Sequence, residues 1–253
     1  MTPKLEVSAL SYSYHTMDGE TQALSNISFT ADTGEFIAIV GPSGCGKSTL
    51  LSLISGLLAP DEGTVRIDGI PLSESRCNIG YMLQKDHLFE WRTIFSNASL
   101  GLEIQHKLDK NHLEKLHTLM ETYGLKQFEE SRPSELSGGM RQRAALIRTL
   151  ALEPDLLLLD EPFSALDYQT RLSVCDDIST IIRNSKKTAV LITHDLSEAV
   201  SAADRIVILT RRPGRIKAIL PISFSKPDLS PLERRNDPAF TSYFNEVWKI
   251  LQN

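Results

Sequence analysis

The sequence predicts an α/β fold in which a mixed, mainly parallel sheet is joined by an N-terminal antiparallel β-subdomain and a helical insertion. Three uninterrupted apolar runs of strand length, at residues 35–40, 155–160 and 188–193, indicate parallel strands that are buried on both faces. From residue 97 to about residue 151 the pattern is mostly helical, with few β-branched runs. We therefore expect the helical insertion to lie between the first and second of these strands.

The remaining elements follow from local patterns along the chain. Residues 5–10 and 23–30 are predicted strands on either side of a turn at residues 16–20, so an antiparallel pair is expected at this end. Residues 211–215 predict a hairpin-like turn near the end of the sheet. We also expect strands at residues 63–69, 79–83, 206–210 and 216–219. Helices are expected at residues 49–58, 168–184 and 231–251. The last of these helices is expected to pack through Phe240, Phe244, Trp248 and Leu251.

The composition of the 253 residues, 41% hydrophobic and 23% charged, argues against disorder and coiled coil. The net charge of -5 argues against a non-specific nucleic-acid binder, because such a surface would repel phosphate backbones. The three cysteines, Cys45, Cys77 and Cys175, form no C-x-x-C pair, so we expect neither a disulfide framework nor a zinc site. A reducing compartment fits this cysteine usage best. No apolar run approaches the roughly 20 residues of a membrane-spanning helix, and no signal peptide is expected. We therefore predict a cytoplasmic protein, which could still dock on a membrane partner.

A glycine-rich loop lies between the strand at residues 35–40 and the helix at residues 49–58. It matches G-x-x-x-x-G-K-[ST], in which glycines let backbone amides turn inward around an anion. Lys47 would reach the β- and γ-phosphates of a nucleotide, and the Ser48 hydroxyl would bind Mg²⁺. The alternative is a plain glycine-rich turn with an exposed lysine, and Cys45 is more simply a small filler than a nucleophile. The candidate nucleotide-binding residues are Gly41, Pro42, Ser43, Gly44, Cys45, Gly46, Lys47, Ser48 and Thr49.

Two acids, Asp160 and Glu161, end the apolar run Leu156-Leu-Leu-Leu. Ligands in an open parallel sheet bind beyond the carboxyl ends of the strands, so both carboxylates are expected to face the phosphate loop. Asp160 would hold Mg²⁺, while Glu161, one residue on and pointing elsewhere, would polarise a water molecule. The alternative, a pair of solvated turn acids, leaves the leucines before them unexplained.

A third motif, Leu136-Ser-Gly-Gly-Met140, is followed by Arg141-Gln-Arg143. Ser137 before two glycines predicts an N-cap with open backbone, and therefore a second phosphate-binding surface at the start of a helix over residues 140–152. Alone, the motif would indicate only a capped helix start. Together with the two motifs above, it makes the chain resemble the ATP-binding subunits of ABC transporters over nearly its whole length.

The resemblance implies one ABC ATP-binding domain over residues 1–253, built on a phosphate-loop ATPase core. The core and β-subdomain would take about residues 1–85 and 155–225, the helical subdomain about residues 86–154, and a C-terminal helical tail about residues 230–253. The implied cofactors are ATP and Mg²⁺. The implied partners are a second copy of the chain, integral membrane permease subunits and, indirectly, a solute-binding protein, with no nucleic acid. The protein would be peripheral on the cytoplasmic face of the cell membrane.

The resemblance also implies roles for residues outside the three motifs. Subunits of the family pair head to tail, so Ser137, Gly138 and Gly139 of one copy would contact the ATP bound by the other. Gln84 resembles the Q-loop glutamine, which binds Mg²⁺ or positions water, and His194 resembles the switch histidine at the γ-phosphate. Glu161, His194 and Lys47 would thus be catalytic, and Ser48, Gln84 and Asp160 would bind the metal.

Two further assignments keep an alternative. Tyr14 stands where the family places the aromatic ring that stacks on adenine, and Tyr12 competes for that role. Residues 164–167 resemble the D-loop, and Asp167 is either a contact between subunits or an acid favoured at a helix N-terminus, or both.

Residues 91–93, Trp-Arg-Thr, and residues 212–215, Arg-Pro-Gly-Arg, resemble the nitrate, sulfonate and taurine importer branch, although Glu90 stands where that branch usually has proline. An exposed Trp91, with Phe89 and Leu88, would suit the groove that receives a helix of the membrane subunit; the alternative is a core residue of the helical subdomain. Nitrate, alkanesulfonates, taurine and vitamin or pyrimidine precursors all fit, because the cargo does not touch this subunit.

Two other functions compete with a transport ATPase that energises import of a small anionic or organic solute. A soluble, non-transport ABC ATPase of DNA repair or translation usually has two cassettes or a long coiled-coil insertion, and this chain has neither. A phosphate-loop kinase or GTPase leaves residues 136–140 and His194 without a role, and the guanine-reading N-K-x-D sequence is missing.

Overall fold

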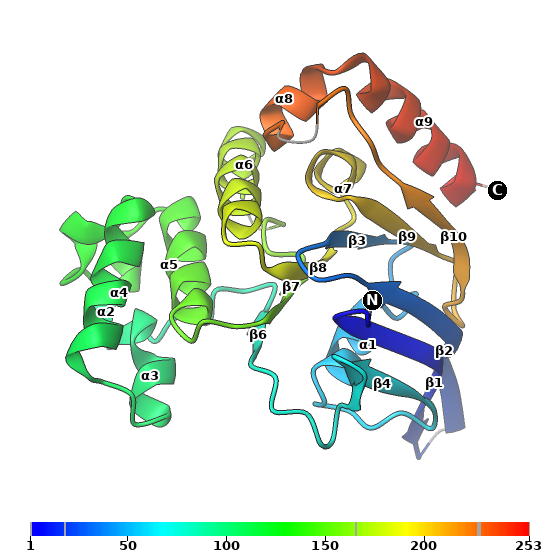
Figure 1. Ribbon diagram of the computed structural model, residues 1–253, viewed down its shortest axis with the longest axis horizontal. Coiled ribbons are helices and arrows are strands. Elements are labelled where there is room, and N and C mark those ends of the chain that lie inside the picture. The colour runs from blue at the N-terminus through cyan, green and yellow to red at the C-terminus, as the bar shows by residue number, and fades with distance from the viewer. Residues whose placement is uncertain (1, 18, 165, 227–228, 253) are drawn as a thin grey trace. The chain divides into compact units, whose positions relative to one another are not determined.

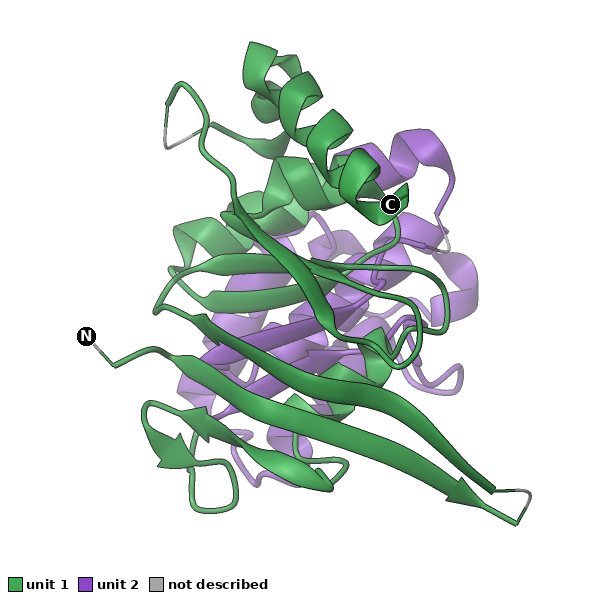
Figure 2. Cartoon of the chain, turned by 90° about the vertical axis from the view of Figure 1, so that its right-hand side faces the viewer, with its two compact units in different colours: residues 1–77, 175–253 green, residues 78–174 purple. Residues whose placement is uncertain are grey.

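The computed structural model describes residues 2–17, 19–164, 166–226 and 229–252 (Figure 1). These form two units, one of residues 1–77 with 175–253 and one of residues 78–174 (Figure 2). The boundaries predicted for the helical subdomain, residues 86–154, stay a prediction. Within the described residues, none of the helices combines the length and the apolar character that crossing a membrane requires.

The first unit contains an antiparallel sheet of strands β1 (Leu5–Thr16), β2 (Gly19–Ala31), β4 (Glu62–Ile67) and β5 (Ile70–Pro71), in the order β2-β1-β4-β5. Strand β1 pairs with β2 from Leu5 opposite Ala31 to Thr16 opposite Gly19, which confirms the predicted antiparallel pair. Both strands are longer than predicted, because the turn signal lies at the tip of a long hairpin rather than between two short strands.

The second sheet of this unit has the order β10-β9-β3-β8, from β3 (Phe36–Val40), β8 (Thr188–Ile192), β9 (Arg205–Leu209) and β10 (Ile216–Pro221). Strand β3 runs parallel to both β8 and β9, whereas β10 pairs antiparallel with β9. Every residue of β3 and β8 is buried, as their uninterrupted apolar runs predict. Helix α1 (Lys47–Ile54) follows β3, and helix α7 (Leu196–Ala202) follows β8.

The C-terminal tail is two helices, α8 (Pro231–Asn236) and α9 (Pro238–Gln252), rather than the single predicted helix. The break falls at Asp237, because the residue before a proline is pushed out of the helical conformation. Buried Arg234 anchors the tail by donating hydrogen bonds to the carbonyl oxygens of Ala203 (3.1 Å) and Leu229 (3.2 Å). The predicted packing through Trp248 is wrong, since Trp248 is 51% exposed and Val247 is the buried residue of α9.

The second unit combines two parallel strands, β6 (Ile79–Met82) and β7 (Leu156–Asp160), with a group of helices. The helices are α2 (Ile94–Ala98), α3 (Leu100–Ile104), α4 (Lys110–Thr122) and α5 (Gly138–Leu150), with 3-10 turns at Lys126–Phe128 and Pro133–Glu135. Helix α6 (Tyr168–Asn184), whose bounds match the prediction, begins in this unit and continues into the first. The helices between β6 and β7 confirm the predicted insertion.

Candidate functional site

The predicted phosphate loop joins β3 to α1. Gly44 and Gly46 have φ of 73° and 103°, in the left-handed region that glycine adopts readily, and Gly46 is the N-cap of α1 without a side-chain cap. Lys47 is only 7% exposed, and its Nζ donates to the carbonyl oxygens of Gly41 (2.9 Å) and Pro42 (3.2 Å). The lysine is therefore held within the loop, and the exposed-lysine alternative is wrong.

Cys45 is a buried part of the loop wall. Its backbone N–H donates to the carbonyl oxygen of Pro42, at 3.3 Å. Burial raises the pKa of the Cys45 thiol, while the charges of Lys47 and Arg212 act to lower it. A buried thiol with a raised pKa is a poor nucleophile, which agrees with Cys45 as a small filler.

Tyr14 lies beside the helix that follows the loop. A hydrogen bond of 3.0 Å joins Tyr14 Oη to Thr49 Oγ1, and the Tyr14 ring is 42% exposed. The ring of Tyr12 packs edge-on against it, with 5.0 Å between centroids, and is half-buried. Of the two candidates, Tyr14 is the one bonded to a residue of the nucleotide-binding motif.

His194 is exposed and comes two residues after β8 ends. On one side of it, Thr193 Oγ1 donates to Glu198 Oε2 at 2.5 Å and accepts from the Asp195 N–H at 3.0 Å. On the other side, Asp195 caps α7 by accepting from the N–H groups of Ser197 and Glu198. The main chain around His194 is thus fixed by hydrogen bonds within the first unit.

In the second unit, Asp160 is the buried last residue of β7, and Glu161 follows it with a positive φ of 44°. Gln84 lies two residues beyond the neighbouring strand β6, and its Nε2 donates to Glu161 Oε2 (3.4 Å) and Ser164 Oγ (3.2 Å). Ser164 Oγ in turn donates to the Glu161 carbonyl oxygen, at 3.0 Å. Gln84, Glu161 and Ser164 therefore form one polar cluster, and the sequence motifs do not predict this direct contact.

The predicted signature segment begins helix α5. The Ser137 Oγ accepts from the Met140 N–H, at 3.4 Å, which confirms the predicted N-cap. Ser137 and Gly138 are exposed, but Gly139 is buried, and a Cβ there would lie 2.8 Å from the side chain of Thr170. Gly139 is thus required for packing against the start of α6.

Asp167 is exposed, and its Oδ1 accepts from the Thr170 N–H, at 3.1 Å. Hydrogen bonds from the side chain and backbone of Thr170 hold the pKa of the Asp167 carboxyl below its usual range. The helix-terminal role proposed for Asp167 is therefore present. Ala165, in the same predicted D-loop, lies outside the described residues.

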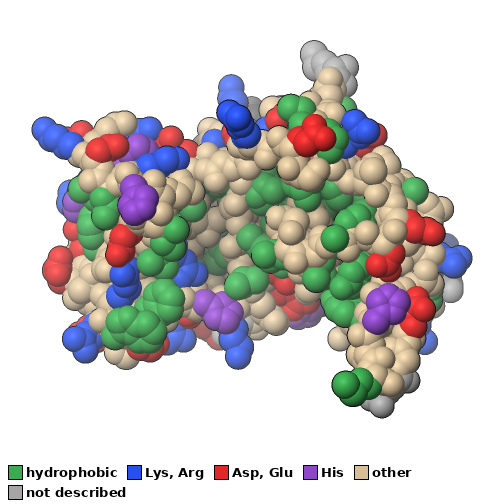
Figure 3. Space-filling view, turned by 90° about the horizontal axis from the view of Figure 1, so that it is seen from below, with side chains coloured by type: hydrophobic (Ala, Val, Ile, Leu, Met, Phe, Trp, Pro, Cys, Tyr) green, Lys and Arg blue, Asp and Glu red, His purple; other side chains and the backbone are tan. Residues whose placement is uncertain are grey.

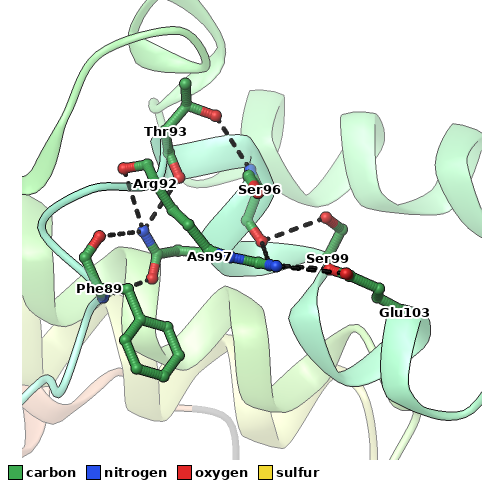
Figure 4. Close-up of polar contacts among 7 residues, drawn as sticks. All are labelled: Phe89, Arg92, Thr93, Ser96, Asn97, Ser99 and Glu103. Atoms are coloured by element: carbon green, nitrogen blue, oxygen red, sulfur yellow. Dashed lines mark hydrogen bonds and ion pairs between the residues drawn. The ribbon is translucent and has the colours of Figure 1, made fainter.

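The segment after Gln84 is organised by buried Asn97 (Figure 4). Its Oδ1 accepts from the Phe89 N–H (2.7 Å), and its Nδ2 donates to the carbonyl oxygens of Phe89 and Thr93, each at 3.0 Å. Trp91, within this loop, is 71% exposed and packs on Phe89 with ring centroids 4.8 Å apart. The core alternative for Trp91 is wrong, whereas Leu88, which was grouped with it, is buried.

The site residues are divided between the units. Tyr14, the phosphate loop and His194 belong to the first unit, and Gln84, Asp160, Glu161 and the signature segment belong to the second. Across the part of the chain that is described, no group of three or more His, Cys, Asp and Glu side chains could hold a metal ion. On the face drawn in Figure 3, acidic and basic side chains are interspersed with hydrophobic ones.

Known proteins with similar sequences point to one family. Residues 24–164 match the family described as ABC transporter. The uncharacterized ABC transporter ATP-binding protein YtlC of Bacillus subtilis is 45% identical over 98% of this chain and 96% of its own. The nitrate import ATP-binding protein NrtD of Synechocystis sp. is 38% identical over 98% of this chain and 95% of its own. The aliphatic sulfonates import ATP-binding protein SsuB of Bacillus licheniformis is 40% identical over 92% of this chain and 88% of its own.

A solved structure agrees with these relatives. The dimeric, post-hydrolysis structure of the ATP-binding cassette MJ0796 bound to ADP and Pi has a TM-score of 0.75 and 29% identity to this chain, covering 87% of it and 99% of the cassette. This chain belongs to the ABC transporter family and has the ABC ATPase fold. Within that family it is an ATP-binding subunit, an ATPase that couples hydrolysis to transport.

Proposed function

We propose that this chain energises the import of a small anionic or organic solute of the nitrate or sulfonate kind, from the cytoplasmic face of a cell membrane. The observation that carries the proposal is the strand, loop and helix at residues 36–54, in which Lys47 is held inside a glycine-rich loop. Relatives named for nitrate import and for aliphatic sulfonate import support the solute class, and taurine is itself a sulfonate.

The nucleotide is proposed to bind along residues 41–49, with its adenine on Tyr14. Helix α1 has no side-chain N-cap, so its first backbone N–H groups can serve the phosphates. The buried lysine Nζ, now hydrogen-bonded to two loop carbonyls, lies where it can exchange those partners for phosphate oxygens. The bond between Tyr14 and Thr49 ties the exposed tyrosine ring to the same motif.

Mg²⁺ is proposed to bind with the nucleotide through oxygen donors. These are the Ser48 hydroxyl after the loop, the Asp160 carboxylate at the end of β7 and the amide oxygen of Gln84. Because Gln84 uses its Nε2 on Glu161 and Ser164, its carbonyl oxygen is the atom that remains for a cation. Such oxygens are the ligands that Mg²⁺ prefers, and the bound ion would neutralise charge on the β- and γ-phosphates.

Hydrolysis is proposed to use Glu161 as the group that polarises the attacking water. The Gln84 amide and the left-handed backbone at Glu161 orient this carboxylate beyond the end of β7. Lys47 and His194 would hold the γ-phosphate and spread the charge of the loose transition state. The hydrogen bonds on both sides of His194 support this role, because they fix its main chain.

A second copy of the chain is proposed to complete each site with Ser137, Gly138 and Gly139. The start of α5 carries an exposed serine and an exposed glycine, so its N-terminal N–H groups are accessible to an anion from a partner. A related cassette is named as dimeric, which supports the same assembly here.

Permease subunits are proposed to dock on the loop that carries Trp91. The exposed Trp91 ring is backed by Phe89, and Asn97 fixes the loop backbone, so the aromatic pair is presented on a rigid support. Exposed aromatic side chains on rigid supports are typical interface anchors. The solute-binding protein would act through the permease rather than on this chain.

Solute uptake tests the proposal. Cells lacking this chain are supplied with the wild type or with Lys47→Ala, and uptake of labelled nitrate, alkanesulfonates and taurine is measured for each. We expect the wild type to restore uptake of one solute and Lys47→Ala to restore none. Uptake of all these solutes that is equal in cells with and without the chain would contradict the proposed solute class.

A further inference from the structure

The turn at residues 210–215 forms an outer wall of the phosphate loop. Gly214 is fastened to strand β2 by two hydrogen bonds of 2.9 Å, from its N–H to the Ala23 carbonyl oxygen and from the Ser25 N–H to its own carbonyl oxygen. Gly214 also lies so close to the loop that a Cβ there would collide with the Cys45 carbonyl oxygen. The turn is thus fixed against the loop by backbone contacts.

One side chain of this turn contacts the loop directly. Arg212 is exposed, and its Nε donates to the Gly44 carbonyl oxygen, at 3.1 Å. The turn that carries Arg212 is itself ordered, since Thr210 Oγ1 accepts from the Arg215 N–H at 3.0 Å and donates to the Pro213 carbonyl oxygen at 3.2 Å. The guanidinium is therefore held at the loop.

This contact is made to the C=O side of the Gly44–Cys45 peptide. A trans peptide is planar, and its C=O and N–H point in opposite directions. With the Gly44 oxygen turned outward to Arg212, the Cys45 N–H turns inward, where it approaches the Pro42 carbonyl oxygen at 3.3 Å. Gly44 has φ of 73°, in the region that glycine adopts readily, and the peptide that follows it is held by Arg212 on its C=O side and by Pro42 on its N–H side.

We propose that Arg212 is a positioning residue for nucleotide binding: it holds the Gly44–Cys45 peptide with its N–H toward the phosphates and places a positive charge beside them. The inference rests on the proposed function of residues 41–49 as the phosphate loop. Burial raises the pKa of the Cys45 thiol, and the charges of Lys47 and, to a smaller extent, Arg212 act to lower it, which agrees with a positive charge near the loop. The ligand class is the polyphosphate of a nucleoside di- or triphosphate.

The chain offers a matched control in the neighbouring Arg211. Arg211 is exposed in the same turn, and its guanidinium makes no hydrogen bond or ion pair to any residue within the described ranges. Arg211→Met and Arg212→Met each remove one positive charge and keep the aliphatic stem. Only Arg212→Met removes the contact with Gly44. Comparing the two variants therefore separates the effect of this contact from the effect of losing one positive charge near the loop.

The experiment measures the Kd of ATP by calorimetry, and KM and kcat by ATP hydrolysis, for the purified full chain. We expect Arg212→Met to raise Kd and KM about fivefold with kcat unchanged, because loss of uniform binding changes KM alone. Arg211→Met should stay within about twofold of the wild type, since an exposed charge is screened. Arg212→Lys should recover most of the affinity, because an ammonium can still donate to the Gly44 oxygen.

Equal shifts for Arg211→Met and Arg212→Met, or no shift for Arg212→Met, would overturn the inference, as would a fall in kcat with KM unchanged. Lys47→Ala separates this failure from a failure of the proposed function. If Lys47→Ala binds ATP like the wild type, the phosphate-loop assignment itself is wrong. If Lys47→Ala loses ATP binding while Arg212→Met does not, only the role of Arg212 is wrong.

Discussion

Gln84 donates its side-chain amide to the carboxylate of Glu161, with 3.4 Å between Nε2 and Oε2. The two residues lie just beyond the ends of neighbouring parallel strands, β6 and β7, which is what brings them together from 77 positions apart in the chain. The contact gives Gln84 a second task besides any metal ligation, which is to orient the carboxylate proposed to polarise water.

Replacing Gln84 tests that second task. Gln84→Ala leaves Glu161 without this donor, so we expect kcat for ATP hydrolysis to fall about tenfold, in line with the loss of one hydrogen bond to a charged group. Gln84→Glu places a like charge beside Glu161, which raises the pKa of the carboxylate pair. Its activity should therefore fall more steeply than that of the wild type as the pH is lowered, because the paired carboxylates take up a proton at a higher pH. Rate-against-pH profiles that are identical for Gln84→Glu and the wild type would contradict the contact.

Mixing two inactive variants tests the shared site. Ser137→Arg damages the site on the partner copy, whereas Lys47→Ala damages the site on its own copy. Each variant alone should be inactive, and an equal mixture should regain at most about a quarter of wild-type activity, because half the dimers then hold one intact site of two. Activity near zero in the mixture, with dimers confirmed, or activity near that of the wild type would refute head-to-tail pairing.

Trp91 is exposed, so replacing it should weaken docking to the permease subunits without affecting the folding of the chain. Trp91→Ala should leave the unfolding temperature and the ATP hydrolysis rate of the purified chain unchanged, while solute uptake by cells falls at least about fivefold, as for an interface anchor. Trp248→Ala, which removes the 51% exposed tryptophan of α9, is the control and should not alter uptake. The docking surface is wrong if Trp91→Ala cells take up solute at the normal rate.

Arg234 joins the tail to the end of α7. Arg234→Met keeps the aliphatic stem but leaves the carbonyl oxygens of Ala203 and Leu229 without their donor, which should cost about 2–3 kcal/mol of unfolding free energy. Urea denaturation measures the loss. Lys249→Met, at an exposed position of α9, is the control and should stay within about 0.5 kcal/mol of the wild type. Equal midpoints for both variants would show that Arg234 does not anchor the tail.

Much of the fold could be predicted because buried parallel strands and capped helices leave local signals. The apolar runs located β3, β7 and β8, and the bounds of α6 were predicted without error. Helix α7 was missed, although the Asp195 cap with Glu198 three residues on is a local signal that could have identified it. The break before Pro238 could likewise have been read from the proline.

The contacts that organise the site could not be predicted in the same way. Arg212 and Gly44 are 168 positions apart, and their meeting depends on how a turn packs against a loop. The hydrogen bonds by which buried Asn97 holds the backbone near exposed Trp91 leave no periodic pattern in the sequence. The sequence motifs thus identified which residues belong to the site. The contacts that these residues make with one another could be found only from the tertiary structure.

Light scattering on purified Glu161→Gln, with and without ATP and Mg²⁺, tests most directly the claim that the chain is an ATPase whose sites are shared between two copies. Glutamine keeps the size of the side chain but cannot polarise water as a carboxylate does, so bound ATP should persist. We predict a shift from monomer to dimer that requires ATP, and that does not occur when Ser137→Arg is added to the same chain. A chain that binds ATP and hydrolyses it at the wild-type rate, while remaining a monomer, would contradict both the role of Glu161 and the shared site.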